Sequence, residues 1–152
     1  MKVKKVICVL VSMFMLTTLL TPFAYEGIVK GAVFQGWYYK ELDDGTVSIT
    51  GYSYNGEAEI VIPEEIGGKR VTCIDGEDIE FFWGIDEYIN IISIEIPASV
   101  TSIDSYIFTG CNRLINITVD EESATYSSED GILYNKEKTE LIKCPCGKEG
   151  SV

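Results

Sequence analysis

The sequence contains no histidine among its 152 residues. No Ser–His or Cys–His nucleophile pair can therefore form, and histidine is also missing as a general base. Basic residues are scarce, because 12 lysines and arginines stand against 24 aspartates and glutamates, a formal charge of −12. Such a chain repels phosphate groups and anionic lipid. We therefore expect neither nucleic acid nor, after export, a membrane as a partner.

The N-terminus has the pattern of an export signal. Three lysines among the first five residues precede an apolar run from Val6 to Leu20. This layout is typical of a secretory signal peptide, and the run is short for a bilayer span, which needs about 20 residues. We expect cleavage near Ala24, with an uncleaved anchor as the alternative. Removal of residues 1–24 leaves nine basic against 24 acidic residues, a formal charge of −15, in a secreted or surface-exposed protein.

Four cysteines follow the predicted signal: Cys73, Cys111, Cys144 and Cys146. An exported chain permits disulfides, and four cysteines can pair in three ways. Cys73 and Cys111 fall within the repeating apolar pattern, which favours buried free thiols for this pair. The Cys144-Pro145-Cys146 segment lacks the spacing of a zinc site, so we expect no metal and no cofactor.

A repeated string organises the chain. Ile91-x-x-Ile94-x-Ile96-Pro97 is followed, 23 residues later, by Leu114-x-x-Ile117-x-Val119. Upstream, the strand-like segment 60–63 and the segment 72–75 repeat the Ile-Pro and Thr-x-Ile-Asp strings, and Phe82-x-Gly84 repeats the later Phe-x-Gly. The apolar residues alternate with polar ones, which predicts short strands with one buried face. Stacked coils would bury these faces, so we predict a mainly β solenoid; the alternative is a β-sandwich.

Two hairpins are predicted outside the stacked strands. The first joins 35–41 to 46–52, with Gly45 at a positive φ, and the second joins 131–134 to 139–143. Part of the aromatic cluster around the first hairpin is expected to cover the first repeat, with a role in a protein interface as the alternative; the cluster consists of Trp37, Tyr38, Tyr39, Tyr52 and Tyr54. The predicted organisation is a signal peptide (1–24), a linker (25–33), an N-terminal β-hairpin cap (34–56), repeats (57–146) and a tail (147–152) that is either truncated or paired with another surface.

Residues 45–146 resemble the BspA-type leucine-rich repeats of bacterial surface proteins. The resemblance is carried by Ile-Glu-Ile-Pro-Ala-Ser-Val-Thr-Ser-Ile at 94–103, Phe-Thr-Gly-Cys-Asn-Arg-Leu at 108–114, Asp-Gly-Ile-Leu-Tyr-Asn-Lys at 130–136 and Leu-Ile-Lys-Cys-Pro at 141–145. It implies an irregular leucine-rich-repeat solenoid that attaches to proteins of a host or a neighbouring cell.

No catalytic constellation is evident, and we predict a protein that is not an enzyme. The acidic pairs lie in loop-like stretches, and Asp43-Asp44-Gly45 and Asp120-Glu121-Glu122 lack the spacing of an EF-hand, so both are interpreted as turns. The candidate binding face consists of the outward residues of successive strands: Glu59, Val61, Ser93, Glu95, Asn116 and Thr118. Adhesion or protein binding is the first hypothesis, and a structural spacer or fragment of a larger surface protein, without its own ligand, is the alternative.

Overall fold

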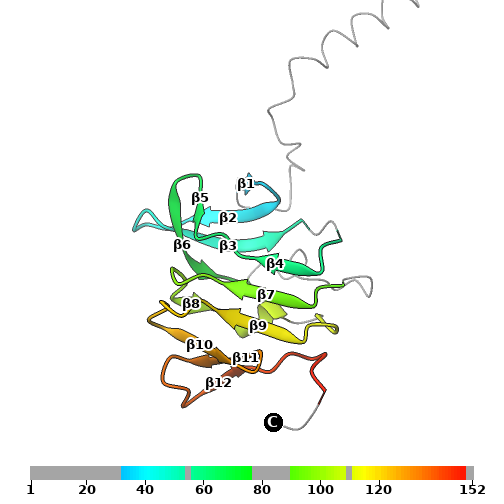
Figure 1. Cartoon of the computed structure of the whole chain (residues 1–152). Coiled ribbons are helices and arrows are strands. Elements are labelled where there is room, and N and C mark those ends of the chain that lie inside the picture. Colours follow the sequence, from blue (N-terminus) through cyan, green and yellow to red (C-terminus); the bar gives the residue numbers. More distant parts are fainter. Residues whose placement is uncertain (1–31, 54–55, 77–89, 109–110, 150–152) are drawn as a thin grey trace, which may run out of the picture.

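The computed structural model describes residues 32–53, 56–76, 90–108 and 111–149. The predicted signal peptide, the Phe82-x-Gly84 repeat and Tyr54 lie outside these residues. Within these four ranges, twelve strands and one short 3-10 helix follow each other along a single stack, from β1 at one end to β12 at the other (Figure 1). The elements are β1 (Ala32–Phe34), β2 (Trp37–Glu41), β3 (Val47–Tyr52), β4 (Glu59–Val61), β5 (Glu65–Ile66), β6 (Lys69–Ile74), β7 (Ser93–Ile96), β8 (Ser102–Ile103), η1 (Ser105–Phe108), β9 (Asn116–Val119), β10 (Tyr126–Glu129), β11 (Ile132–Asn135) and β12 (Leu141–Lys143).

The predicted stack of Ile-x-Ile strands is confirmed. Strands β4, β7 and β9 form a parallel ladder, in which Ile60 pairs with Ile94 and Ile94 with Ile117. The pairing continues past β4, because the Ile62 N–H donates to the Glu95 carbonyl at 3.0 Å. Ile96 in turn pairs with Val119. The chain thus returns to the same position one coil later, as the 23-residue spacing requires.

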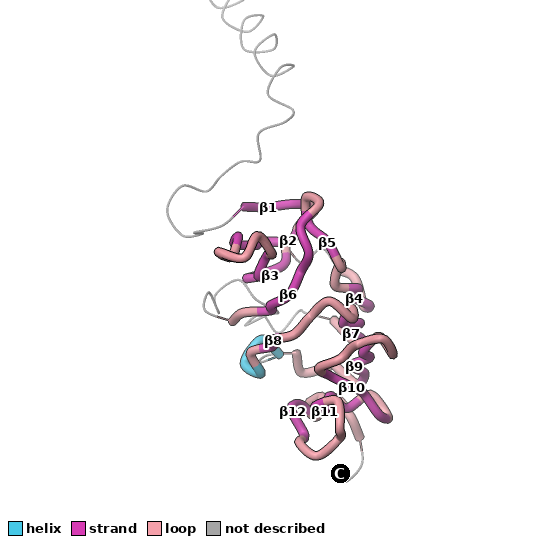
Figure 2. Tube along the Cα trace, turned by 90° about the vertical axis from the view of Figure 1, so that its left-hand side faces the viewer, coloured by secondary structure: helices cyan, strands magenta, loops and turns pink. Residues whose placement is uncertain are grey.

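A second parallel ladder runs along the other side of the stack (Figure 2). Strands β3, β6 and β8 pair in parallel, so that Ile49 lies beside Ile74 and Ile74 beside Ile103. The Thr-x-Ile-Asp string forms the second and third members of this ladder. The first member, β3, belongs to the predicted N-terminal hairpin, which is confirmed by the antiparallel pairing of β2 with β3. The hairpin is therefore continuous with the solenoid.

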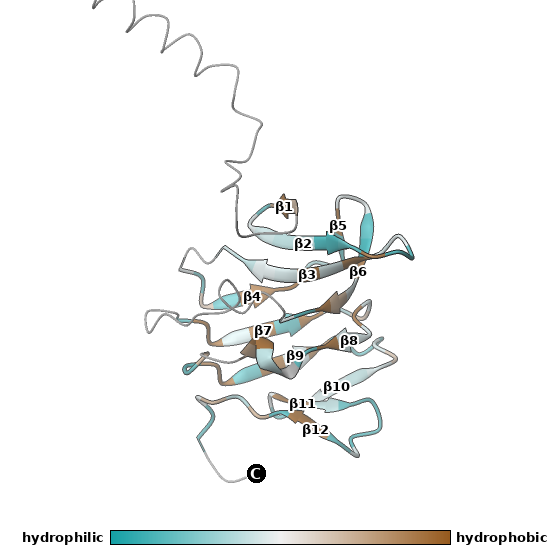
Figure 3. Cartoon of the chain, turned by 180° about the vertical axis from the view of Figure 1, so that it is seen from behind, coloured by the Kyte–Doolittle hydropathy of each residue, from teal (hydrophilic) through white to brown (hydrophobic). Residues whose placement is uncertain are grey.

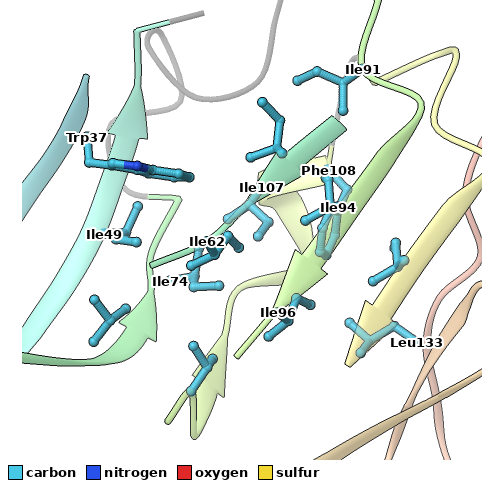
Figure 4. Packing of buried hydrophobic residues seen from close by; sticks show 14 of the residues in the cluster. Trp37, Ile49, Ile62, Ile74, Ile91, Ile94, Ile96, Ile107, Phe108 and Leu133 are labelled. Carbon is cyan, nitrogen blue, oxygen red and sulfur yellow. The ribbon is translucent and has the colours of Figure 1, made fainter. Parts of the chain in front are cut away.

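The apolar core fills the space between the two ladders. Figure 4 shows Ile49 and Ile74 from one ladder facing the same interior as Ile94 and Ile96 from the other, and all four side chains are fully buried. Phe108 closes the coil as expected, with 1% of its surface exposed. Each buried isoleucine or phenylalanine stabilises the fold by about 1.5–3 kcal/mol relative to an exposed one, so no coil is stable without its neighbours.

The N-terminal end is covered by aromatic side chains, as predicted. Trp37 is buried, and its ring lies 4.5 Å from that of Tyr52. Gly45 has the predicted positive φ of 84°. An additional strand, β1, starts inside the segment predicted as a linker and pairs with β2 through a turn at Gln35 and Gly36. None of the described residues lies in a helix long and apolar enough to cross a bilayer.

The C-terminal end is closed by a sheet of three antiparallel strands, β10, β11 and β12. The pairing of β11 with β12 confirms the second predicted hairpin. The β10–β11 hairpin, which turns at Asp130 and Gly131, was not predicted. It covers the edge of β9, where the Ile117 N–H donates to the Gly131 carbonyl at 3.0 Å and the Val119 N–H to Ser128 Oγ at 3.0 Å.

Candidate functional site

The six predicted binding-face residues lie together on the outward side of the β4–β7–β9 ladder. Its register places them in two rows across the strands, which are Glu59–Ser93–Asn116 and Val61–Glu95–Thr118. They are outward because the isoleucines between them turn into the core. We call these six residues the binding face.

Exposure differs along the binding face. Glu59, Val61 and Glu95 are exposed, and Val61 keeps 63% of its surface accessible. The members on β9 are half-buried. Asn116 Nδ2 donates to Ser93 Oγ at 3.2 Å, and Thr118 Oγ1 donates to the Ile94 carbonyl at 3.4 Å. The β4 and β7 side of the face is therefore the part most accessible to a partner.

A shallow hollow adjoins one end of the binding face. It is lined by Glu95, Thr118, Val119, Asp120, Glu121 and Glu122, and we call it the acidic hollow. Asp120 Oδ1 accepts the Glu122 N–H at 2.8 Å, and Lys136 Nζ donates to the Glu121 carbonyl at 3.2 Å. The turn predicted for 120–122 is confirmed by the first of these bonds. Sequence reasoning assigned these acids only to that turn and missed their contribution to a surface shared with Glu95.

The other acidic segment, at 43–45, also acts as a turn. Asp44 Oδ1 accepts both the backbone N–H of Thr46 at 2.9 Å and its hydroxyl at 2.6 Å. These hydrogen bonds hold the pKa of Asp44 below its ordinary value. The carboxylate is thus used by the turn of the β2–β3 hairpin, which is the role interpreted from the sequence. Within the described residues, no group of three or more metal-ligating side chains comes together.

The four described cysteines differ in their exposure to solvent. None of the four described cysteines is in a disulfide bond with another, and Cys111 is buried, as expected. Burial raises the pKa of the Cys111 thiol to about 12, so it stays protonated at neutral pH. Cys73 differs from the prediction, because it is only half-buried and occupies the ladder position of Ser48 and Ser102 rather than an apolar position. Cys146 is exposed.

Two parallel ladders that enclose one apolar core, joined by irregular turns, define a leucine-rich-repeat solenoid. The fold is similar to a leucine-rich cell surface protein from Faecalibacterium prausnitzii, with a TM-score of 0.50, 24% identity, and coverage of 60% of this chain and 24% of that one. Similarities also exist to the leucine-rich-repeat protein of T. pallidum (TM-score 0.47, 26% identity, 58% and 38% coverage) and to one from Eubacterium ventriosum (TM-score 0.37, 19% identity, 78% and 51% coverage). No protein-family profile and no curated protein matches the sequence.

The described chain thus has the fold of bacterial leucine-rich-repeat proteins, as its resemblance to BspA-type repeats implied. It spans about a quarter of the length of the F. prausnitzii protein.

Proposed function

We propose that this protein is an exported, non-catalytic leucine-rich-repeat module that binds a protein partner through its binding face. The observation that carries the proposal is the register of β4, β7 and β9, which aligns outward side chains from three coils on one continuous sheet surface. Repeat solenoids use such aligned surfaces for extended protein contacts.

The charge of this surface indicates the kind of partner. Glu59 and Glu95 lie on the binding face, and the acidic hollow adds three consecutive acids at 120–122. The six binding-face residues include no basic side chain. A basic patch on a host or neighbouring-cell surface protein is complementary to this arrangement, and the exposed Val61 side chain supplies an apolar contact between the carboxylates.

The proposal also includes export of the protein and a location at the cell surface. The N-terminal sequence has the pattern of a signal peptide, and the F. prausnitzii protein with a similar fold is described as a cell surface protein. No histidine is available for catalysis, and leucine-rich-repeat folds generally serve binding.

Surface plasmon resonance against a panel of purified host extracellular-matrix proteins tests the proposal. We expect saturable binding to at least one of them, and the Glu95→Lys variant should weaken it by tenfold or more, because it places a positive charge in the middle of the face. The matched control is Glu137→Lys, which makes the same charge change in the exposed β11–β12 turn and should change affinity by less than about twofold. Absence of saturable binding to matrix proteins and to intact neighbouring cells would favour the structural spacer.

A further inference from the structure

Strand β1 forms an open edge of the N-terminal sheet. The strand order is β1-β2-β3-β6-β5, so β1 has β2 on one side and none of the described strands on the other. A two-residue turn links β1 to β2, with Gln35 at φ 50° and Gly36 at φ 88°, and Phe34 faces Trp37 across it. Residues that flank such a turn bond to each other, so the next residue, Val33, directs its N–H and C=O outward.

This edge lacks both charged side chains and a covering hairpin. Among the described residues, β4 and β12 are also outer strands of their sheets, but β4 carries Glu59 and β12 carries Lys143. Strand β1 reads Ala-Val-Phe, without charge, proline or bulge, and Val33 and Phe34 keep 40% and 39% of their surface exposed. Figure 3 shows β1 as a hydrophobic strand at the end of the stack. By contrast, β12 is interrupted by a register shift against β11, and β9 is covered by the β10–β11 hairpin. Open apolar edges are templates for strand pairing.

The surroundings of β1 are also close to neutral in a strongly acidic protein. Residues 31–39 include no charged side chain. The next two residues are neutralised locally, because Lys40 Nζ lies 2.6 Å from Asp75 Oδ2 and Glu41 Oε2 lies 2.5 Å from Lys69 Nζ. Two copies of the exported protein, each with the formal charge of −15 expected after removal of residues 1–24, repel over most of their surfaces. At β1 they can approach without bringing unpaired acids together.

We propose that β1 pairs with β1 of a second copy, antiparallel and centred on Val33. The two-fold arrangement is self-complementary, since each Val33 N–H donates to the Val33 carbonyl of the other copy and the apolar side chains of both strands are shared. The contact is small, so the dimer is weak and concentration-dependent. The binding face lies on the other ladder, and pairing at β1 leaves it accessible (Figure 2).

Sedimentation equilibrium of the exported protein over micromolar to millimolar concentration tests the pairing. We expect a monomer–dimer equilibrium. Its dissociation constant should fall when NaCl is raised from low to physiological concentration, because salt screens the repulsion between the acidic copies. Val33→Lys should raise the dimer dissociation constant at least tenfold, because it brings two ammonium groups together at the two-fold axis. Leu141→Lys is the matched control at an exposed aliphatic residue outside the binding face and should leave the constant within twofold.

Amide hydrogen exchange gives a second measurement that does not depend on a variant. Exchange at Val33 should slow as protein concentration rises, while exchange at the exposed Val61 should not. A protein that is monomeric at all concentrations overturns the proposal, as does a dimer that Val33→Lys leaves intact. Failure to bind a protein partner would not by itself overturn the dimer proposal, because partner binding depends on the β4–β7–β9 ladder.

Discussion

The Tyr126 hydroxyl ends the β3–β6–β8 ladder. Removing this hydroxyl measures how much its hydrogen bonds at the end of the ladder contribute to the free energy of unfolding. Strand β8 is the last member of this ladder. On its open side, the Ile103 N–H donates to the Tyr126 hydroxyl at 3.0 Å, and the hydroxyl donates to the Thr101 carbonyl at 3.4 Å. One side chain therefore occupies the place that a further strand would fill.

The Tyr126→Phe variant removes both hydrogen bonds and keeps the ring. The 3.4 Å bond is long and contributes little, so the main cost comes from the Ile103 N–H. A buried donor without a partner costs about 1–3 kcal/mol. Ile103 is half-buried, and water can reach it in part. We therefore expect the free energy of unfolding to fall by about 1–2 kcal/mol, which corresponds to a melting temperature lower by roughly 4–8 °C.

Urea denaturation followed by tryptophan fluorescence and far-UV circular dichroism measures this loss. The matched control is Tyr106→Phe, because Tyr106 is 68% exposed, and this variant should stay within about 0.5 kcal/mol of the parent. If the two variants lose equal stability, the hydroxyl of Tyr126 does not terminate the ladder.

The pH dependence provides a separate check on Tyr126. Burial raises the pKa of Tyr126 above its ordinary value. The resulting stability is fully present below the unfolded-state pKa of about 10 and is lost as pH rises through the higher folded-state pKa. The parent should therefore lose more stability than Tyr126→Phe above pH 10. Parallel pH profiles for the two proteins would contradict this account.

Three further predictions test turn geometry, thiol accessibility and core packing. Gly131→Ala should lower the free energy of unfolding by more than about 2 kcal/mol, because φ is 76° and the added Cβ would lie 3.1 Å from both the Asn116 Cα and the Ile115 carbonyl oxygen and 2.6 Å from the Asn116 side-chain oxygen. Gly45→Ala, at φ 84° with open space around the added Cβ, should cost about 1 kcal/mol. Urea midpoints compare the two variants. Cys146 should react with a thiol reagent within minutes at pH 8, and Cys111 only after urea is added, because it is buried with a pKa of about 12. Ile94→Ala should lose about 2–5 kcal/mol of stability from a fully buried site, measured by the same denaturation.

The sequence predicted the β4–β7–β9 ladder because its pattern is nearly invariant. Ile60-x-Ile62, Ile94-x-Ile96 and Ile117-x-Val119 share one alternation, so the strands and their stacking partners follow from the same residue pattern, although the first spacing is 34 residues and the second is 23. The outward position of the six binding-face residues followed as well, since alternation determines which side chains point outward; their role in binding stays a prediction. The acidic hollow could not be predicted from the sequence pattern. It forms where the turn at 120–122 lies beside Glu95, and the place of that turn depends on where β9 ends and on how the following hairpin packs.

The second ladder was harder to predict because its members have different neighbours. Val47-Ser48-Ile49 lies in a hairpin, without the preceding Ile-Pro segment that marks later coils. The β10–β11 turn contained a usable signal, since Asp130 and Gly131 both have positive φ and Asp-Gly is a strong hairpin pattern. Cys73 was misplaced because residue type suggested an apolar position, while the register groups it with serines.

The two ends of the solenoid are closed by different means, and this difference explains why only one end is proposed to self-associate. At the C-terminal end, the two ladders terminate against Tyr126 and the β10–β11 hairpin, which satisfy backbone groups of β8 and β9 from within the chain. At the N-terminal end, Trp37 covers the core, but the edge of β1 meets no described strand. An aromatic lid excludes water from apolar side chains without pairing backbone groups. Strand β1 is therefore an uncharged edge whose outward backbone groups meet no described strand, and β1 of a second copy, which has the same groups, can pair with it.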